Sequence, residues 1–161
     1  MIALPDDALV IGLGGNVGGD AAIVARFVRA REALAQLGEV RSAPLYRTAA
    51  IGPAQPDFLN TAVRVRYRDG TPGELIATIL ELERLLGRDR RGEARNGPRA
   101  IDLDVLVWGA RQIRTPELEL PHPRLFERRF ALEPLAELFA EVRPLLARVA
   151  DQRCELVTTT W

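Results

Sequence analysis

Residues 96–108 read NGPRAIDLDVLVW, and this stretch organises the rest of the chain. Its turn-forming Gly-Pro pair is followed by a run of β-branched and large apolar residues, which predicts a buried strand. Asp102 and Asp104 interrupt that run at alternate positions. Because side chains alternate across a strand, both carboxylates leave the same face, about 7 Å apart at their Cα atoms. The apolar side chains expected to point the other way are those of Ile101, Leu103 and Val105.

Two like charges on a half-buried strand repel each other and lose solvation, so a bound cation is the simplest reason for the pair. Mg²⁺ prefers oxygen ligands, and it usually binds proteins together with substrate phosphates. A D-x-D pair on an edge strand can equally be a solvated face. From these two residues alone, both interpretations stay open.

The segment before this strand favours the cation. It is rich in glycine, which lets a loop fold over a ligand and reopen. It is also rich in arginine, whose guanidinium group binds phosphate oxygens bidentately. A carboxylate pair beside such a loop is what a complex of Mg²⁺ with a polyphosphate requires. The arginines that lead into the strand are Arg84, Arg88, Arg90, Arg91, Arg95 and Arg99.

The composition narrows the class of protein. The length of 161 residues predicts one domain, residues 1–161, and the 22 basic and 22 acidic residues leave no net charge. That balance argues against a general nucleic-acid binder, which carries a basic excess. All of the basic residues are arginine, so every cationic contact to phosphate has to come from arginine. Cys154 is the single cysteine and no apolar run approaches ~20 residues, so we expect a soluble, cytoplasmic protein without disulfides.

The hydrophobic periodicity predicts the order strand–helix–strand–strand–helix–strand. This order is typical of a split βαβ unit, an α+β sandwich of ferredoxin-like fold with a mostly antiparallel sheet and helices packed on one face. Asp20 is the expected N-cap of the first helix, and residues 71–74 form a capping box for the second. The strands before the D-x-D strand are expected at residues 8–13, 40–48 and 58–67. The tail from residue 131 onward predicts one or two short helices.

Three further positions are candidates for ligand contacts. Phe58 and Asn60 share a face of the third strand, where a ring and a carboxamide suit a flat heterocycle, although a core phenylalanine and a strand-end asparagine give the same pattern. Glu83 lies on the apolar stripe of the second helix beside the arginine loop, so it is either an edge residue or a group that faces a ligand. The only histidine, His122, has no second histidine or cysteine beside it, which argues against a zinc site.

Taken together, these motifs resemble the signature of the 6-hydroxymethyl-7,8-dihydropterin pyrophosphokinases of folate biosynthesis. The resemblance covers residues 11–135, and its central part is residues 96–99 running into the D-x-D strand. Position 96 holds an asparagine where members of the family can hold an aromatic residue. The companion motifs, in chain order, are Gly14-Gly15-Asn16, Tyr46-Arg47-Thr48, Gly52-Pro53, residues 56–60, residues 120–124, Arg128 and Phe130.

The resemblance implies transfer of the β,γ-diphosphate of ATP to the hydroxymethyl oxygen of the pterin, with release of AMP. It implies that Asp102 and Asp104 hold two Mg²⁺ ions, and that Arg88 and Arg99 are catalytic residues that neutralise charge on the transferring group. The side chains expected to contact ATP are those of Glu83, Arg88, Arg90, Arg99, Val105, His122 and Arg128. The pterin slot is expected to comprise Thr48, Gly52, Phe58, Asn60, Asp102 and Phe130. The expected partners are these two small molecules, with no nucleic acid, no membrane and a monomeric chain.

Two other classes of protein compete with this interpretation. Another Mg²⁺-dependent D-x-D transferase, such as a nucleotidyl- or glycosyltransferase, would explain the acid pair but not the groups at positions 58, 60 and 130. An RNA-recognition-like binding module shares the strand order, but it presents aromatic residues on central strands and a basic face. This chain has few aromatic residues and no net charge, so we expect the pyrophosphokinase.

Overall fold

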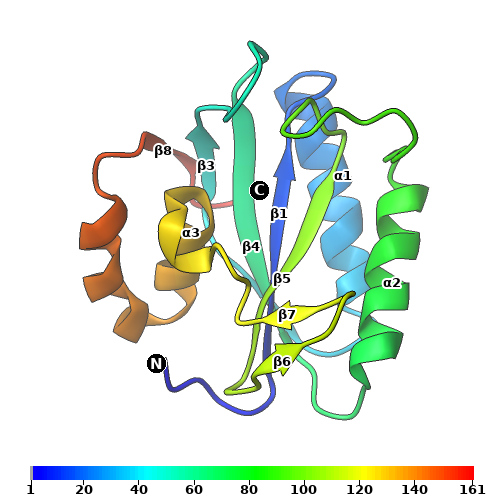
Figure 1. Cartoon of the computed structure of the whole chain (residues 1–161), viewed down its shortest axis with the longest axis vertical. Coiled ribbons are helices and arrows are strands. Elements are labelled where there is room, and N and C mark those ends of the chain that lie inside the picture. The colour runs from blue at the N-terminus through cyan, green and yellow to red at the C-terminus, as the bar shows by residue number, and fades with distance from the viewer. Residues whose placement is uncertain (1) are drawn as a thin grey trace.

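The structure is a computed structural model that describes residues 2–161. Two long helices and a small third one pack against an antiparallel sheet (Figure 1). In chain order the elements are β1 (Ala8–Gly15), α1 (Asp20–Leu34), β2 (Val40–Ser42), β3 (Leu45–Thr48), β4 (Phe58–Arg66), α2 (Pro72–Leu85), β5 (Asp102–Trp108), β6 (Ile113–Arg114), β7 (Glu119–Leu120), the 3-10 helix η1 (Leu125–Glu127), α3 (Arg129–Leu138), the 3-10 helix η2 (Ala140–Val149) and β8 (Cys154–Thr158).

Within residues 2–161, six strands form the main sheet, in the order β5-β1-β4-β3-β8 with β2 also paired to β4. Every pairing in this sheet is antiparallel. The order β5-β1-β4-β3, with α1 and α2 as the crossovers, is that of a split βαβ unit. The predicted α+β sandwich of ferredoxin-like fold is therefore confirmed.

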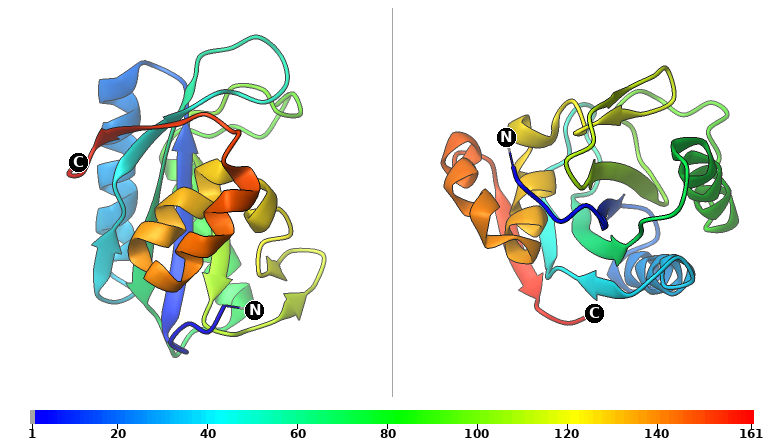
Figure 2. Two further views of the ribbon diagram at one scale, coloured as in Figure 1. Left: turned by 90° about the vertical axis from the view of Figure 1, so that its left-hand side faces the viewer. Right: turned by 90° about the horizontal axis from the view of Figure 1, so that it is seen from below.

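Helices cover both faces of the sheet (Figure 2, right). The first face packs on α1 and α2 around fully buried Phe27 and Leu75, with Ile101, Leu103 and Val105 pointing into this core as predicted. The opposite face packs on α3 and η2 around Leu132 and Val142. The expectation that helices pack on one face only is therefore wrong, because the helices after residue 128 have an apolar side that packs on the second face of the sheet. Because Ala62 of β4 and Leu106 of β5 belong to it, the face that carries Asp102 and Asp104 is the α3 face.

Two local predictions need correction. The segment at residues 40–48 is two strands rather than one, because Pro44 has no N–H to continue the ladder between β2 and β3. Asp20 is the first residue of α1 and not its N-cap. Gly19 takes that position at φ 82°, a conformation that favours glycine, while the Asp20 carboxylate accepts from Arg47 at 2.6 Å.

The loops that matter most lie together at one end of the sheet, at the top of Figure 1. They are residues 16–19 after β1, residues 49–57 before β4 and residues 86–101 before β5. Antiparallel strands bring the end of β1 next to the starts of β4 and β5, so these loops meet although they are far apart in the sequence. No helix within residues 2–161 is both long and apolar enough to cross a membrane.

The start of α2 provides a test of the fold. Thr71 Oγ1 accepts from the Glu74 N–H at 3.2 Å, and the Glu74 carboxylate accepts from the Thr71 N–H at 3.1 Å, which confirms the predicted capping box. We expect Thr71→Ala to lower the free energy of unfolding by about 1 kcal/mol in urea titrations, because helix N–H groups lose their acceptor. Thr159→Ala, at an exposed position, is the control and should change it by much less. Equal effects would contradict the capping role.

Candidate active site

A cavity of about 110 Å³ opens above the end of the sheet, on the face that carries α3. Its walls come from the four strands β1, β3, β4 and β5, from the loops before β4 and β5, and from the start of α3. The structure thus brings together nearly all of the residues that the sequence predicts for a pterin slot. Those that line the cavity are Thr48, Phe58, Asn60, Asp102 and Phe130.

The sheet register explains how this cavity is built. Gly14 of β1 is paired with Asn60 of β4 on one side and with Asp102 of β5 on the other. A Cβ atom on Gly14 would lie 2.7 Å from Asn60 Oδ1. Any residue other than glycine at position 14 would therefore displace the Asn60 side-chain amide. Asn60 Nδ2 donates to Thr48 Oγ1 at 2.6 Å, and both side chains are almost fully buried. This hydrogen bond orients the Asn60 carbonyl oxygen.

A second cavity lies on the other side of the acid pair, between α2, β5 and the loop after β7. It gathers most of the side chains that the sequence predicts for ATP, together with apolar side chains of α2 such as Ile79 and Leu80. The predicted residues that line it are Glu83, Arg90, Asp104, Val105 and His122. Burial first, and then the charge of Arg128, lower the pKa of His122, so its imidazole is neutral at physiological pH.

Asp102 and Asp104 stand between the two cavities, because Asp102 lines the first and Asp104 the second. Asp102 accepts from Arg88, whereas Asp104 forms no ion pair among residues 2–161. Burial and the neighbouring charges of Asp102 and Glu83 raise the pKa of Asp104 to about 7. A carboxylate that is costly to ionise, next to a second acid, fits a site completed by a cation.

The available side chains limit which cation the acid pair could hold. Within residues 2–161 no group of three or more histidine, cysteine, aspartate or glutamate side chains is arranged to hold a metal ion. Two carboxylates alone do not make a closed protein site. They do match Mg²⁺, which takes one or two carboxylates and fills its other positions with water and substrate phosphate oxygens.

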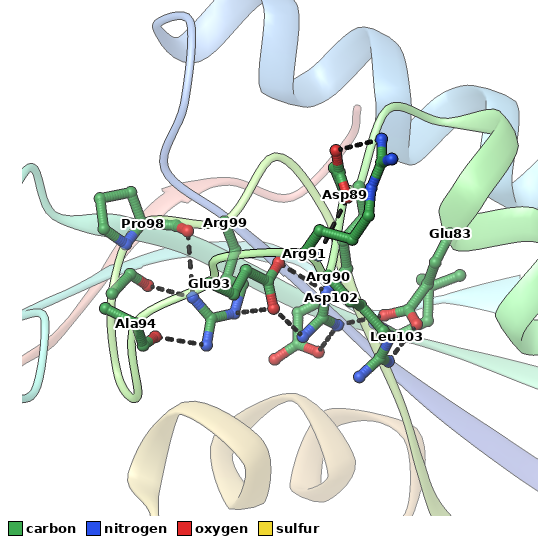
Figure 3. Close-up of polar contacts among 12 residues, drawn as sticks. Glu83, Asp89, Arg90, Arg91, Glu93, Ala94, Pro98, Arg99, Asp102 and Leu103 are labelled. Carbon is green, nitrogen blue, oxygen red and sulfur yellow. Dashed lines mark hydrogen bonds and ion pairs between the residues drawn. The ribbon is translucent and has the colours of Figure 1, made fainter.

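An ionic network joins the end of α2, the arginine loop and the start of β5 (Figure 3). Arg88, with a side chain 8% exposed, donates to Glu83, to Asp102 at 2.7 Å and to both oxygens of Glu93 at 3.1 Å. Glu83, 1% exposed, also accepts from Arg90 at 2.6 Å and from the Leu103 N–H at 2.9 Å. In this conformation Glu83 anchors β5 and the arginine loop.

Arg99 and Arg128 lie on the first cavity rather than on the second, although the sequence groups them with the ATP contacts. Arg99 is folded onto its own loop, where it donates to Gly97 and Ala94 carbonyl oxygens at 2.9 and 3.1 Å. Gly52 does not line the first cavity among the described residues. At φ 100° it packs against Asn96, and a Cβ atom there would lie 2.9 Å from that of Asn96.

The sequence reasoning missed a hydrogen-bonding centre at Asn16. This side chain is 4% exposed, and its Oδ1 accepts from the Arg99 N–H at 2.9 Å. Its Nδ2 donates to Gln55 and to the Pro56 carbonyl, each at 2.9 Å, while Gln55 donates onward to the Asn96 carbonyl at 2.6 Å. The motif containing Asn16 was recognised, but no local signal shows that one amide joins three loops. Glu93, the acid that pairs with Arg88, was also missed.

The comparisons with known proteins agree with this architecture. A Plasmodium falciparum HPPK-DHPS, solved as a triple mutant with STZ-DHP, superposes with a TM-score of 0.67 over 89% of this chain, at 14% identity. The present chain spans 43% of that longer one. The likeness shows the fold and places the chain in the class of ferredoxin-like α/β proteins.

Sequence comparison is more specific. The model of the family described as 7,8-dihydro-6-hydroxymethylpterin-pyrophosphokinase matches residues 10–140. The 2-amino-4-hydroxy-6-hydroxymethyldihydropteridine pyrophosphokinase of Methylorubrum extorquens is 41% identical over 155 residues, covering 91% of this chain and 96% of the relative. The enzyme of the same name from Synechocystis is 36% identical over 152 residues, covering 94% and 76%.

The chain belongs to the 7,8-dihydro-6-hydroxymethylpterin-pyrophosphokinase family. The family predicted from the motifs is confirmed, and with it the interpretation as a pyrophosphokinase of folate biosynthesis that uses ATP as co-substrate. The alternatives of a nucleotidyl- or glycosyltransferase and of an RNA-recognition-like module are set aside by this membership.

The raised pKa of Asp104 predicts an unusual stability effect. The folded-state pKa lies above the unfolded value of 3.8, so this group favours folding most when it is protonated, and that advantage is lost as the pH rises through about 7. We expect Asp104→Asn to raise the melting temperature of the metal-free protein by roughly 5 °C at pH 8, and by less at pH 5, because the amide needs no desolvation of charge.

The measurement is differential scanning fluorimetry in the presence of a chelator. Asp69→Asn, at an exposed position outside the site, is the matched control and should leave the melting temperature nearly unchanged at both pH values. If Asp104→Asn is less stable than the parent at pH 8, the ionised carboxylate stabilises the folded state and the prediction is wrong.

Proposed function

We propose that the chain transfers the diphosphate of ATP to the hydroxymethyl oxygen of 6-hydroxymethyl-7,8-dihydropterin, with the pterin in the first cavity and ATP in the second. The observation that carries this assignment is the position of Asp102 and Asp104 between the two cavities. A pyrophosphokinase has to bring a nucleotide polyphosphate and an acceptor hydroxyl together at a charged centre. The two cavities meet at such a centre.

The pterin slot combines aromatic and amide groups. Phe58 and Phe130 come from distant parts of the sequence but line the same cavity, where they can hold a flat bicyclic ring between them. Asn60, held by Thr48, presents a carboxamide for the hydrogen-bonding edge of the ring. This arrangement supports a preference for a pterin over a sugar or a second nucleotide.

Asp102 and Asp104 would hold Mg²⁺, and two ions are expected when the triphosphate is present. Bound Mg²⁺ would neutralise phosphate charge and polarise the attacking hydroxyl. No third acid, histidine or cysteine completes a metal-binding group with these two carboxylates in residues 2–161, so water and phosphate oxygens would supply the remaining ligands. The arginine that contacts Asp102 in the structure, Arg88, would then be released from it to contact phosphate.

The chemical step requires positioning more than covalent catalysis. The hydroxymethyl oxygen attacks the β-phosphorus of ATP, the bond from that phosphorus to the α,β-bridging oxygen breaks, the hydroxyl proton is lost and AMP leaves. Arg88 and Arg99 would stabilise the negative charge on the transferring group, and Arg128 would do so from the pterin side. Arg90 and His122, on the second cavity, would contact the nucleotide. The monomeric state and the cytoplasmic location stay predictions.

Removal of either aspartate tests the metal assignment. We expect Asp102→Ala and Asp104→Ala each to lower kcat at least about a hundredfold, because each variant would lose a ligand to the Mg²⁺ that neutralises charge in the transition state. Calorimetric titration of Mg²⁺ with a non-hydrolysable ATP analogue should show weakened binding in both. Asp89→Ala, at an exposed position in the loop before β5, is the control for loss of an acid. Near-normal turnover of either site variant would refute the assignment.

Analysis of the products formed during turnover tests which group is transferred. ATP and the pterin, incubated with the parent protein and Mg²⁺, should give AMP and pterin diphosphate in equal amounts. Formation of ADP or of free inorganic pyrophosphate instead would contradict a diphosphate transfer.

The aromatic wall can be tested separately. We expect Phe58→Ala to weaken pterin binding about tenfold, since a stacking contact and its buried area are lost, and to leave ATP binding within about twofold. Isothermal titration with each substrate measures both, and ATP serves as the internal control. Equal losses for the two ligands would move the pterin slot elsewhere.

A further inference from the structure

The helix that carries part of the proposed pterin slot starts without a cap of its own. α3 begins at Arg129, and its N-cap residue Arg128 makes no side-chain capping hydrogen bond to residues 2–161. The first N–H groups of a helix have no intrahelical partner and need an acceptor from elsewhere. In α3 that acceptor comes from a distant part of the chain.

Gln152 provides it. Its Oε1 accepts from the Arg129 N–H at 2.9 Å, and its Nε2 donates to the Glu127 carbonyl oxygen at 2.8 Å. The Gln152 side-chain amide therefore hydrogen-bonds to the backbone on both sides of Arg128. The segment that carries it follows η2 and returns past α3 to the sheet as β8 (Figure 2, left).

The contact is reciprocal. The guanidinium group of Arg129 donates to the Gln152 carbonyl at 2.9 Å and to the Ala150 carbonyl at 3.3 Å, and it pairs with Glu133 one turn further along α3 at 2.8 Å. Backbone and side chain of residue 152 are thus both bound to the start of α3.

The hydrogen bonds of Gln152 fix the backbone at the α3 side of the first cavity. Arg128 and Phe130 flank Arg129, whose backbone N–H is bound by Gln152, and both line the cavity. The Arg128 guanidinium lies 5.4 Å from the centre of the Phe130 ring. A small shift of the backbone at residues 127–129 would move both groups together, because nothing else caps this end of the helix within the described chain.

We propose that Gln152 is a positioning residue for pterin binding, which acts through the backbone of Glu127 and Arg129 to place Phe130 against the substrate. The proposal rests on the proposed function, since it takes the first cavity as the pterin slot. It gives a role in substrate binding to the segment that follows η2, which lines neither substrate cavity.

A double-mutant cycle tests it on the full chain. Gln152→Ala, Phe130→Ala and the double variant are titrated with 6-hydroxymethyl-7,8-dihydropterin in the presence of Mg²⁺ and a non-hydrolysable ATP analogue, and KM is measured for each substrate. We expect Gln152→Ala to raise the pterin Kd and KM about fivefold, with the ATP KM within twofold. In the Phe130→Ala background, the same substitution should change the pterin Kd less than twofold, because the group that it positions is gone.

The outcomes separate the assignment of the slot from the role of Gln152. If Phe130→Ala leaves pterin affinity unchanged, the slot assignment is wrong and the role of Gln152 falls with it. If Phe130→Ala weakens binding but Gln152→Ala does not, only the positioning role is overturned. The positioning role is also overturned if the effects of the two substitutions multiply in the double variant, since independent losses mean that Gln152 does not act through Phe130.

Two more variants guard against a simple loss of stability. Gln36→Ala, at an exposed position near the end of α1, is the matched glutamine control and should leave pterin Kd unchanged. Gln152→Glu keeps the oxygen that accepts from Arg129 but loses the donor to Glu127, so we expect pterin affinity between those of the parent and the alanine variant. An affinity as low as that of Gln152→Ala would contradict capping through Arg129.

Discussion

The structure depends on how negative charge is balanced at the start of β5. Asp102 is neutralised by the nearly buried Arg88, while Asp104 stays without an ionic partner among the described residues and has a raised pKa. Folding therefore leaves one carboxylate in an unfavourable state. In the proposed function, binding of a cation and phosphate at this pair would compensate for the lost solvation.

The sheet turns this charge centre into a site between two cavities. Gly14, in the strand between β4 and β5, has no side chain, so Asn60 and Asp102 face the same space on either side of it. The loops at that end of the sheet are joined by Asn16 rather than by local turns alone. Strands thus carry Asn60 and Asp102, while hydrogen bonds from Asn16 connect the surrounding loops.

Much of this arrangement could be predicted from local patterns. The alternation around Asp102 and Asp104 predicts their shared face, and the capping box at Thr71 predicts the start of α2, since both are short-range effects of backbone geometry. The predictions near Pro44 and Gly19 were wrong by one or a few residues. Both errors follow from backbone hydrogen bonding and φ values that composition alone does not reveal.

By itself, the sequence determined the order of elements in the split βαβ unit, the family and the pairing of an acid motif with an arginine loop, whereas the edge strand β8 was not predicted. It could do so because periodicity, turn residues and motif spacing are properties of neighbouring residues. Only the tertiary structure decided which arginine meets which acid, that Glu83 anchors β5, and that Gln152 caps α3 from 23 residues away. These contacts join segments that meet only when both faces of the sheet are packed, so their partners cannot be read along the chain.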